Sequence, residues 1–187
     1  GHAIRNGNIQ TEGVVGIFSV LSGTVTRLCV EKTTVKYKNE GMRAGGIAAR
    51  ITGEGEISNC IVKDCKIENN GLSGVVGGIA AAMFDQGVIK NCLVLNTSLS
   101  ASRTGSICSD TKSGNVISRC YTDGDHITSS DSYADVQNSL PKVSTESLKS
   151  GEICHKLNGG INHPDPKWFQ NISGSKLDNI PVLSEEH

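Results

Sequence analysis

Apolar and polar residues alternate in four similar segments of the chain. The segments are GTVTRLCV at 23–30, GEISNCIV at 55–62, GVIKNCLV at 87–94 and NVISRCYT at 115–122. The first three follow one another at an offset of 32 residues, and the last follows at 28. Within each copy the alternation has the period of a β-strand and not that of a helix. The pattern therefore predicts a repeat built from short strands.

The same offsets align further apolar residues outside these segments. One coil of this size cannot bury its own apolar face, whereas stacked coils share a core, with neighbouring strands about 4.8 Å apart. We therefore expect an all-β chain folded as a right-handed parallel β-helix of about four coils, each with about three short strands. A leucine-rich solenoid is disfavoured, because the second half of each copy lacks a helical period. The aligned columns are Val25, Ile57, Ile89 and Ile117; Leu28, Cys60, Cys92 and Cys120; Val35, Ile67, Leu99 and Ile127; and Ile17, Ile47, Ile79 and Ile107.

The opening residues GHAIRNGNI fit the same template. This alignment places Ile4, Asn6 and Ile9 at the positions of Ile57, Asn59 and Val62. The next copy would then follow after only 21 residues. We therefore expect a short first coil, entered part-way, and further coils before it in the native protein.

The columns end near residue 130. Residues 1–130 are expected to form the β-helix, and residues 131–187 a capping segment. Because exposed strand edges at the end of a solenoid invite pairing, a helix in this segment and the Trp168-Phe169 pair should cover the last coil.

One short helix is predicted in the capping segment. The run STESLKSGEICHKLNGG at 144–160 favours a helix near 145–158, with Ser144 or Thr145 as N-cap and Gly159 as the stop. Its buried stripe would consist of Leu148, Ile153 and Leu157.

Composition supports an all-β chain and limits the partners. Glycine is abundant, with 22 residues, and aromatic residues make up 4%, a balance that favours short strands and tight turns. The 18 basic and 19 acidic side chains give a net charge of −1, so no long-range field attracts nucleic acid. No run approaches the ~18 apolar residues that span a bilayer, so we expect no membrane insertion. Any export signal would lie outside this sequence.

Three runs bring the chain close to a known family: GIFSVLSGTVTRLCV, GGIAARITGEGEISNCIV and GGIAAAMFDQGVIKNCLV. They resemble the GLUG repeat, a Gly-rich strand followed by G-x-I-x-N-C/L-x-V, and the likeness covers residues 1 to about 130. GLUG repeats occur in secreted and surface bacterial proteins, including some proteases that cleave immunoglobulin A, where they lie outside the catalytic part. The resemblance implies display or binding.

The C-terminal runs SGEICHKLNGG, WFQNI and DNIPVL are similar to segments that follow such repeats in surface proteins of gut Bacteroidetes. This similarity is less specific than that of the repeats, and it brings no activity with it. Together the two resemblances imply a secreted or cell-surface location in a bacterium.

The seven cysteines are odd in number and lack regular short spacing, which argues against a disulfide framework. Cys60, Cys92 and Cys120 share a column with Leu28, so we interpret them as a ladder of buried core thiols. Cys108 aligns with small residues and is also expected in the core. The pattern leaves Cys29, Cys65 and Cys154 unassigned.

No catalytic, cofactor-binding or metal-binding residue is assigned. Cys60 and Cys65 lack a partner pair at the short spacing of a zinc site. His155 is expected on the helix, and His163 and Asp165 in a loop, so their convergence is unsupported. The G-G-I runs are not phosphate loops, because no helix follows them to supply amide donors.

Asparagines recur just before the ladder cysteines. Asn59 and Asn91 should stack at a coil corner, where their side chains can bond one another and the local backbone. Arg27 and Arg119 take this position at the two ends of the series. We expect a structural role for this short ladder.

The function that these observations favour is a noncatalytic module of a secreted or surface protein, either a stalk or an adhesin that binds host protein or glycan. The alternative is a carbohydrate-active enzyme of the β-helix class, a lyase or a glycosidase. A glycosidase needs two carboxylates about 5 to 9.5 Å apart. No column repeats Asp or Glu: Glu56 aligns with Thr24, Val88 and Val116, and Asp64 with Lys32, Asn96 and Gly124.

Overall fold

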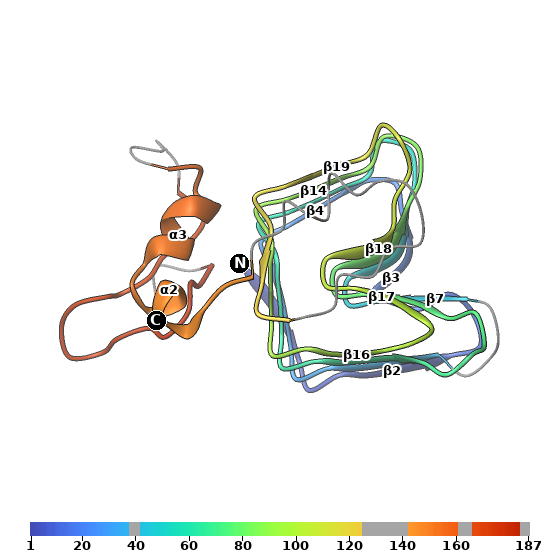
Figure 1. The fold of residues 1–187 in the computed structure, drawn as a ribbon, viewed down its shortest axis with the longest axis horizontal. Helices are drawn as coiled ribbons and strands as arrows, with labels where there is room; N and C mark the ends of the chain where they lie inside the picture. Colours follow the sequence, from blue (N-terminus) through green and yellow to red (C-terminus); the bar gives the residue numbers. More distant parts are fainter. Residues whose placement is uncertain (38–41, 125–141, 161–165, 184–187) are drawn as a thin grey trace.

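The computed structural model describes residues 1–37, 42–124, 142–160 and 166–183. In the view down the stack, strands of successive coils lie over one another (Figure 1). These strands pair in parallel, so the chain is a parallel β-solenoid, as the repeat predicts. No helix in the described ranges is long and apolar enough to cross a membrane.

Five parallel sheets form the walls of the solenoid. Sheet A contains β1 (His2–Arg5), β5 (Leu28–Glu31), β10 (Ile61–Lys63), β15 (Leu93–Leu95) and β20 (Tyr121–Thr122). Sheet B contains β2 (Asn8–Thr11), β6 (Thr34–Tyr37), β11 (Lys66–Asn69) and β16 (Ser98–Ser100). Sheet C contains β7 (Arg43–Gly45), β12 (Val75–Gly77) and β17 (Arg103–Gly105). Sheet D contains β3 (Phe18–Leu21), β8 (Ala48–Ile51), β13 (Ala80–Met83) and β18 (Cys108–Asp110). Sheet E contains β4 (Thr24–Thr26), β9 (Glu56–Ser58), β14 (Val88–Lys90) and β19 (Val116–Ser118).

Three coils are complete, with five strands each: coil 2 (β5 to β9), coil 3 (β10 to β14) and coil 4 (β15 to β19). Coil 1 has β1 to β4, and a single bridge from Val15 to Ala44 replaces a sheet C strand. The prediction of about three strands per coil was too low. Many corners are single residues with positive φ, such as Asn59 and Asp64. In the sequence these corners look like polar positions of one longer strand.

The aligned columns are confirmed as columns of the core. Ile57 pairs with Val25 on one side and Ile89 on the other, and Ile67 likewise with Val35 and Leu99. Ile127 lies outside the described residues. Each buried isoleucine contributes roughly 1.5–3 kcal/mol of transfer free energy, so the stacked columns supply the main driving force for coil formation.

The register of coil 1 differs from the sequence alignment. Ile4 pairs with Val30, and Asn6 donates its backbone N–H to Glu31 at the corner after sheet A. The predicted equivalence of Ile4, Asn6 and Ile9 with Ile57, Asn59 and Val62 was therefore wrong by one strand. The two corners that flank sheet A have the same local sequence pattern: an apolar residue, a polar residue and then a residue with positive φ. The alignment therefore matched the first coil to the wrong corner.

Sheets C and D fold inward, so the outline of each coil is indented on one side (Figure 1). The chain enters along sheet C, turns at a Gly-Gly-Ile run or its equivalent, and leaves along sheet D. A Cβ on Gly77 would lie 1.7 Å from the carbonyl oxygen of Ala80, and one on Gly45 would lie 1.9 Å from that of Ala48. The inward turn therefore requires glycine, because no other residue leaves room for the backbone.

The predicted single helix near 145–158 is divided into α2 (Thr145–Lys149) and α3 (Glu152–Leu157). Ser144 is the N-cap of α2, and its side chain accepts a hydrogen bond from the backbone N–H of Ser147 at 3.1 Å. Gly151 adopts φ 84° between the helices, which interrupts the helical hydrogen bonding.

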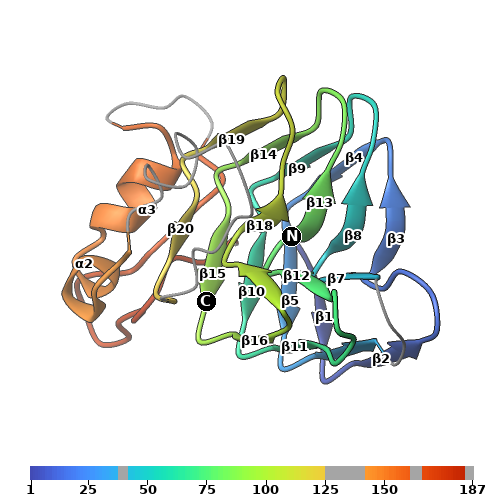
Figure 2. The same ribbon diagram turned by 45° about the vertical axis from the view of Figure 1, so that its right-hand side comes forward.

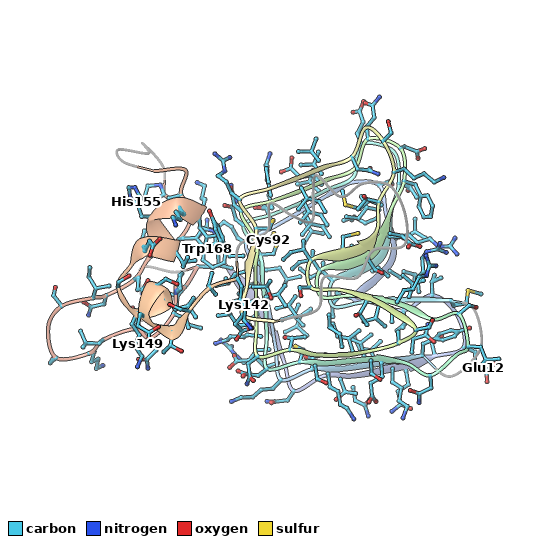
Figure 3. All side chains as sticks on the ribbon, in the orientation of Figure 1. Glu12, Cys92, Lys142, Lys149, His155 and Trp168 are labelled. Carbon is cyan, nitrogen blue, oxygen red and sulfur yellow. The ribbon has the colours of Figure 1, made fainter. Side chains whose placement is uncertain are left out.

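In the view down the stack the helices lie beside the coils and not over them (Figure 1), and in the turned view they lie next to β20 (Figure 2). Trp168 is buried between α3 and sheet A (Figure 3). In the described residues the helices and Trp168 cover the outer face of sheet A, because several of its strands are apolar on both faces and must be covered from outside. Lys142, at the start of the segment, forms a bridge with Thr122 of the last strand. The outer-face cluster contains Ile61, Leu93, Leu95, Tyr121, Leu148, Ile153, Leu157 and Trp168.

Candidate functional site

Two columns of side chains face each other at the open end of the inward fold. The sheet C column consists of Arg43, Val75 and Arg103, in coils 2, 3 and 4. The sheet D column consists of Val20, Arg50, Ala82 and Asp110, in coils 1 to 4. Ion pairs connect the two columns, so both line the same part of the surface.

Asp110 joins two arginines from different coils. Arg103 donates from Nη1 to Oδ1 of Asp110 at 2.9 Å, and Arg43 donates from Nη2 to Oδ2 at 3.2 Å. Arg43 belongs to coil 2, so its side chain passes coil 3 to reach the carboxylate. The sheet D residue of coil 3 is Ala82, whose small side chain leaves space for this crossing. Both carboxylate oxygens of Asp110 are thereby engaged.

Phe84 adds an aromatic ring next to these charges. The Cζ atom of Arg43 lies 5.3 Å from the ring centroid, and the Nζ atom of Lys112 lies 4.8 Å from it. Cations at this distance are attracted by the ring, with about 0.5–1 kcal/mol at exposed positions. The ring therefore lies next to two cations, one of which, Arg43, also binds Asp110.

We call Arg43, Arg50, Arg103, Asp110, Lys112 and Phe84 the arginine cluster. It contains four cations and one carboxylate. The Nε atoms of Arg43 and Arg50 are buried, and neither has a hydrogen-bond partner in the part of the chain that the structure describes. A buried donor without a partner costs roughly 1–3 kcal/mol.

The arginine cluster is suited to binding an anion. General acid–base cleavage of a glycosidic bond would need a pair of carboxylates. The cluster has one, and two guanidinium groups already engage both of its oxygens.

A second candidate is a pocket of about 240 Å³ between sheet A and the C-terminal residues 180–183. Its cations, Arg5 and Lys63, both contact Glu31, at 2.9 and 3.4 Å. Burial raises the pKa of the Cys29 thiol in its wall, so this thiol stays protonated and is a poor nucleophile. Arg5 and Lys63 are therefore already paired, whereas Arg50 of the arginine cluster has no ion pair within the described residues.

The cysteine ladder is confirmed as part of the core. Cys60, Cys92 and Cys120 are buried in the central apolar cluster, with Cys92 on the inner side of sheet A (Figure 3). Each thiol donates to the carbonyl oxygen two residues before it, at 3.2, 3.2 and 3.4 Å. Cys108 is buried in register with Ala80, as expected. All seven cysteines are free thiols.

The asparagine ladder is also confirmed. Asn91 donates from Nδ2 to Oδ1 of Asn59 at 3.4 Å and accepts from Nε of Arg119 at 2.8 Å. All four members of the column, including Arg27, adopt φ between 49° and 57°. The ladder therefore fixes the left-handed corner between sheets E and A.

His155 lies on α3, as expected from the sequence (Figure 3). His163 and Asp165 lie outside the described residues. Within the described ranges, no three His, Cys, Asp or Glu side chains come together in a group that could hold a metal ion.

Comparison of the chain with models of protein families, with curated protein sequences and with solved structures gives no match. The site must therefore be interpreted from its own geometry.

The sequence contains a signal for the arginine cluster that lies outside the apolar and acidic columns. Arg43, Val75 and Arg103 precede the glycine runs at the same offsets of 32 and 28 as the repeat. No repeated Asp or Glu marks these positions. The contact of Arg43 with Asp110, which lies two coils away, follows only from the inward fold.

Proposed function

We propose that this chain is a noncatalytic module of a secreted or cell-surface bacterial protein, and that it binds a ligand at the arginine cluster. The GLUG-like repeats support the location and the display role. The ligand is a host protein or a glycan, as expected for an adhesin.

One observation carries the binding role: along coils 2 to 4 the cluster brings four cations and one carboxylate to the same face, on a chain whose net charge is only −1, and two of these cations bind the carboxylate. Charges of one sign gathered in one place attract an oppositely charged ligand even when the whole protein is nearly neutral. A stalk that only spaces other domains does not need such a concentration. On sheet A, by contrast, the charged side chains Arg5, Glu31 and Lys63 alternate in sign along the stack and form ion pairs.

The test is binding of the labelled protein to an array of host glycans and matrix proteins. We expect a reproducible signal that the double substitution Arg43→Ala with Arg103→Ala reduces. Lys66→Ala, on sheet B, removes an exposed charge far along the coil from the cluster and is the matched control. Silence across the whole array would contradict the binding role and favour a stalk.

A further inference from the structure

We infer that the ligand of the arginine cluster is an acidic polysaccharide, recognised through its carboxylate or sulfate groups. The inference rests on the proposed function and adds the chemical class of the ligand. It follows from the guanidinium groups, from the backbone pairing of sheets C and D, and from the residues that surround Arg50.

Asp110 shows what the cluster recognises. Its carboxylate accepts hydrogen bonds from two guanidinium groups, each 2.9–3.2 Å away. Guanidinium groups present parallel N–H donors that match the oxygens of carboxylates and sulfates. The protein thus already holds one anionic group in this place, with cations left over for a second.

Arg50 is the group that a ligand can engage. Within the described residues, no hydrogen bond or ion pair occupies its guanidinium group, and its Nε is buried without a partner. Its neighbours along the column are Val20 and Ala82, which offer neither charge nor hydrogen bonds from their side chains. An anion that reaches Arg50 therefore has no competitor at the adjacent positions of the column. The carboxylate of the column, Asp110, lies two coils away and is held by Arg43 and Arg103.

Within the cluster, the cations extend along the stack. Arg50 lies in coil 2, and Lys112 follows β18 in coil 4. Two coil spacings correspond to about 10 Å. A polymer that carries anionic groups at intervals can contact both ends of the cluster at once, which a single small anion cannot.

A polysaccharide fits this surface better than an acidic peptide does. The strands of sheets C and D in coil 3 are hydrogen-bonded on both sides, to coils 2 and 4. Strand β8, which carries Arg50, is also hydrogen-bonded on both sides, to β3 and β13, so an extended peptide finds no free backbone edge beside Arg50. A sugar chain needs only side-chain contacts. The half-exposed Val20, beside Arg50, adds an apolar surface for the C–H face of a sugar ring.

The experiment measures binding of the whole chain to immobilised polymers in matched pairs. Polygalacturonate is compared with its fully methyl-esterified form, and dextran sulfate with dextran, so that each pair differs in charge and not in the sugar backbone. Polyglutamate represents the acidic peptide. We expect binding to polygalacturonate, dextran sulfate or both, no binding to the neutral partners, and weakening between about 0.05 M and 0.5 M salt.

Two substitutions should act in opposite directions. Arg50→Ala gives coil 2 the alanine that coil 3 has at the equivalent position, Ala82, so the variant should fold. It should weaken binding about tenfold or more, because charge-assisted hydrogen bonds to the ligand are lost. Asp110→Asn removes the internal carboxylate and should strengthen binding several-fold, because the competing negative charge is lost and Arg43 is released from its ion pair. A substitution that merely disturbed the fold would weaken binding in both cases. Lys66→Ala should leave the affinity unchanged.

Equal binding to charged and neutral polymers would overturn the inference and leave the proposed binding role intact. A preference for polyglutamate over both anionic polysaccharides would also overturn the inference, because the ligand would then be an acidic peptide. An array signal that is insensitive to Arg50→Ala and to Asp110→Asn would place the ligand elsewhere on the chain. If the arginine-dependent array signal is also absent, the proposed function fails as well.

Discussion

A Cβ atom added to Gly78 would lie 2.0 Å from the carbonyl oxygen of Ser106 in the next coil. The same relationship holds one coil earlier, where a Cβ on Gly46 would lie 2.2 Å from the carbonyl oxygen of Gly78. Ser106 is the last described member of this column, and it is the one member that carries a side chain. The second glycine of each run is therefore required by the coil that stacks on it.

Gly78→Ala should destabilise the protein by on the order of 1–3 kcal/mol, because the added methyl group meets a backbone atom that cannot turn aside. Urea unfolding followed by circular dichroism measures the loss. Ser106→Ala is the matched control, since that position already accepts a Cβ, and it should cost less than about 1 kcal/mol. Equal losses for the two substitutions would show that the stacked carbonyl does not impose the glycine.

The left-handed corner offers a second prediction. Asn91→Ala removes the hydrogen bonds to Asn59 and Arg119 and places alanine at φ 53°, so we expect a loss of roughly 1–3 kcal/mol in the free energy of unfolding. Asn91→Gly loses the same hydrogen bonds but relieves the backbone strain, so its loss should be smaller. Thermal or urea unfolding of the pair separates the two contributions. A glycine variant less stable than the alanine variant would contradict the role of the left-handed corner.

The buried thiols predict a loss of stability at alkaline pH. Burial raises the pKa of Cys92 and of Cys108 above the ordinary value of 9.0, and it raises that of Cys154 to about 11. In the unfolded chain these thiols ionise near 9, whereas in the folded chain they keep their protons. Their contribution to stability is therefore complete below about pH 9 and is lost as the pH rises above it. Urea unfolding at about pH 7 and about pH 10 measures the difference.

Cys108→Ala tests the thiol origin of this effect. Alanine occupies the same column in coils 2 and 3, so the variant should fold and lose less than about 1.5 kcal/mol at neutral pH. It should also lose less stability than the natural chain between neutral and alkaline pH. An unchanged alkaline loss would assign the effect to groups other than this thiol.

The cover on sheet A gives a fourth prediction. Leu157 is fully buried in the outer-face cluster with Trp168, so Leu157→Ala should cost roughly 2–4 kcal/mol and loosen the C-terminal segment. Trp168 is the single tryptophan of the chain, so its fluorescence reports on this cluster alone. We expect a red shift of its emission at lower urea concentration than in the natural chain.

Lys149→Ala, on the exposed side of α2, is the control for this substitution and should leave the emission unchanged. If the β-sheet circular dichroism and the Trp168 emission of the Leu157→Ala variant change together at every urea concentration, the C-terminal segment and the coils unfold as one unit.

Columns of core residues could be predicted because stacking repeats the same environment in every coil. Ile57 and Ile89 occupy equivalent positions, so their shared apolar character appears in the sequence as a period. The thiol ladder and the asparagine ladder followed from the same period. The first coil was misaligned because two corners share one local pattern, and only the pairing of Ile4 with Val30 distinguishes them.

The place of the C-terminal segment could have been suspected from Leu93-Val94-Leu95, a run without polar positions, which indicates a strand buried on both faces. Which element covers the outer face was not encoded in that run. It depends on where the chain returns after the last coil, a long-range property of the fold.

The sequence by itself determined that this protein is a solenoid, because each coil must present the same residues to the next and this requirement is written as a period. Only the tertiary structure decided that the solenoid folds inward and that Arg43 meets Asp110 across two coils. The contact joins residues that do not repeat with the period of the coils. It depends on the turn between sheets C and D, where glycine allows the backbone to fold inward but does not determine which side chains then face each other.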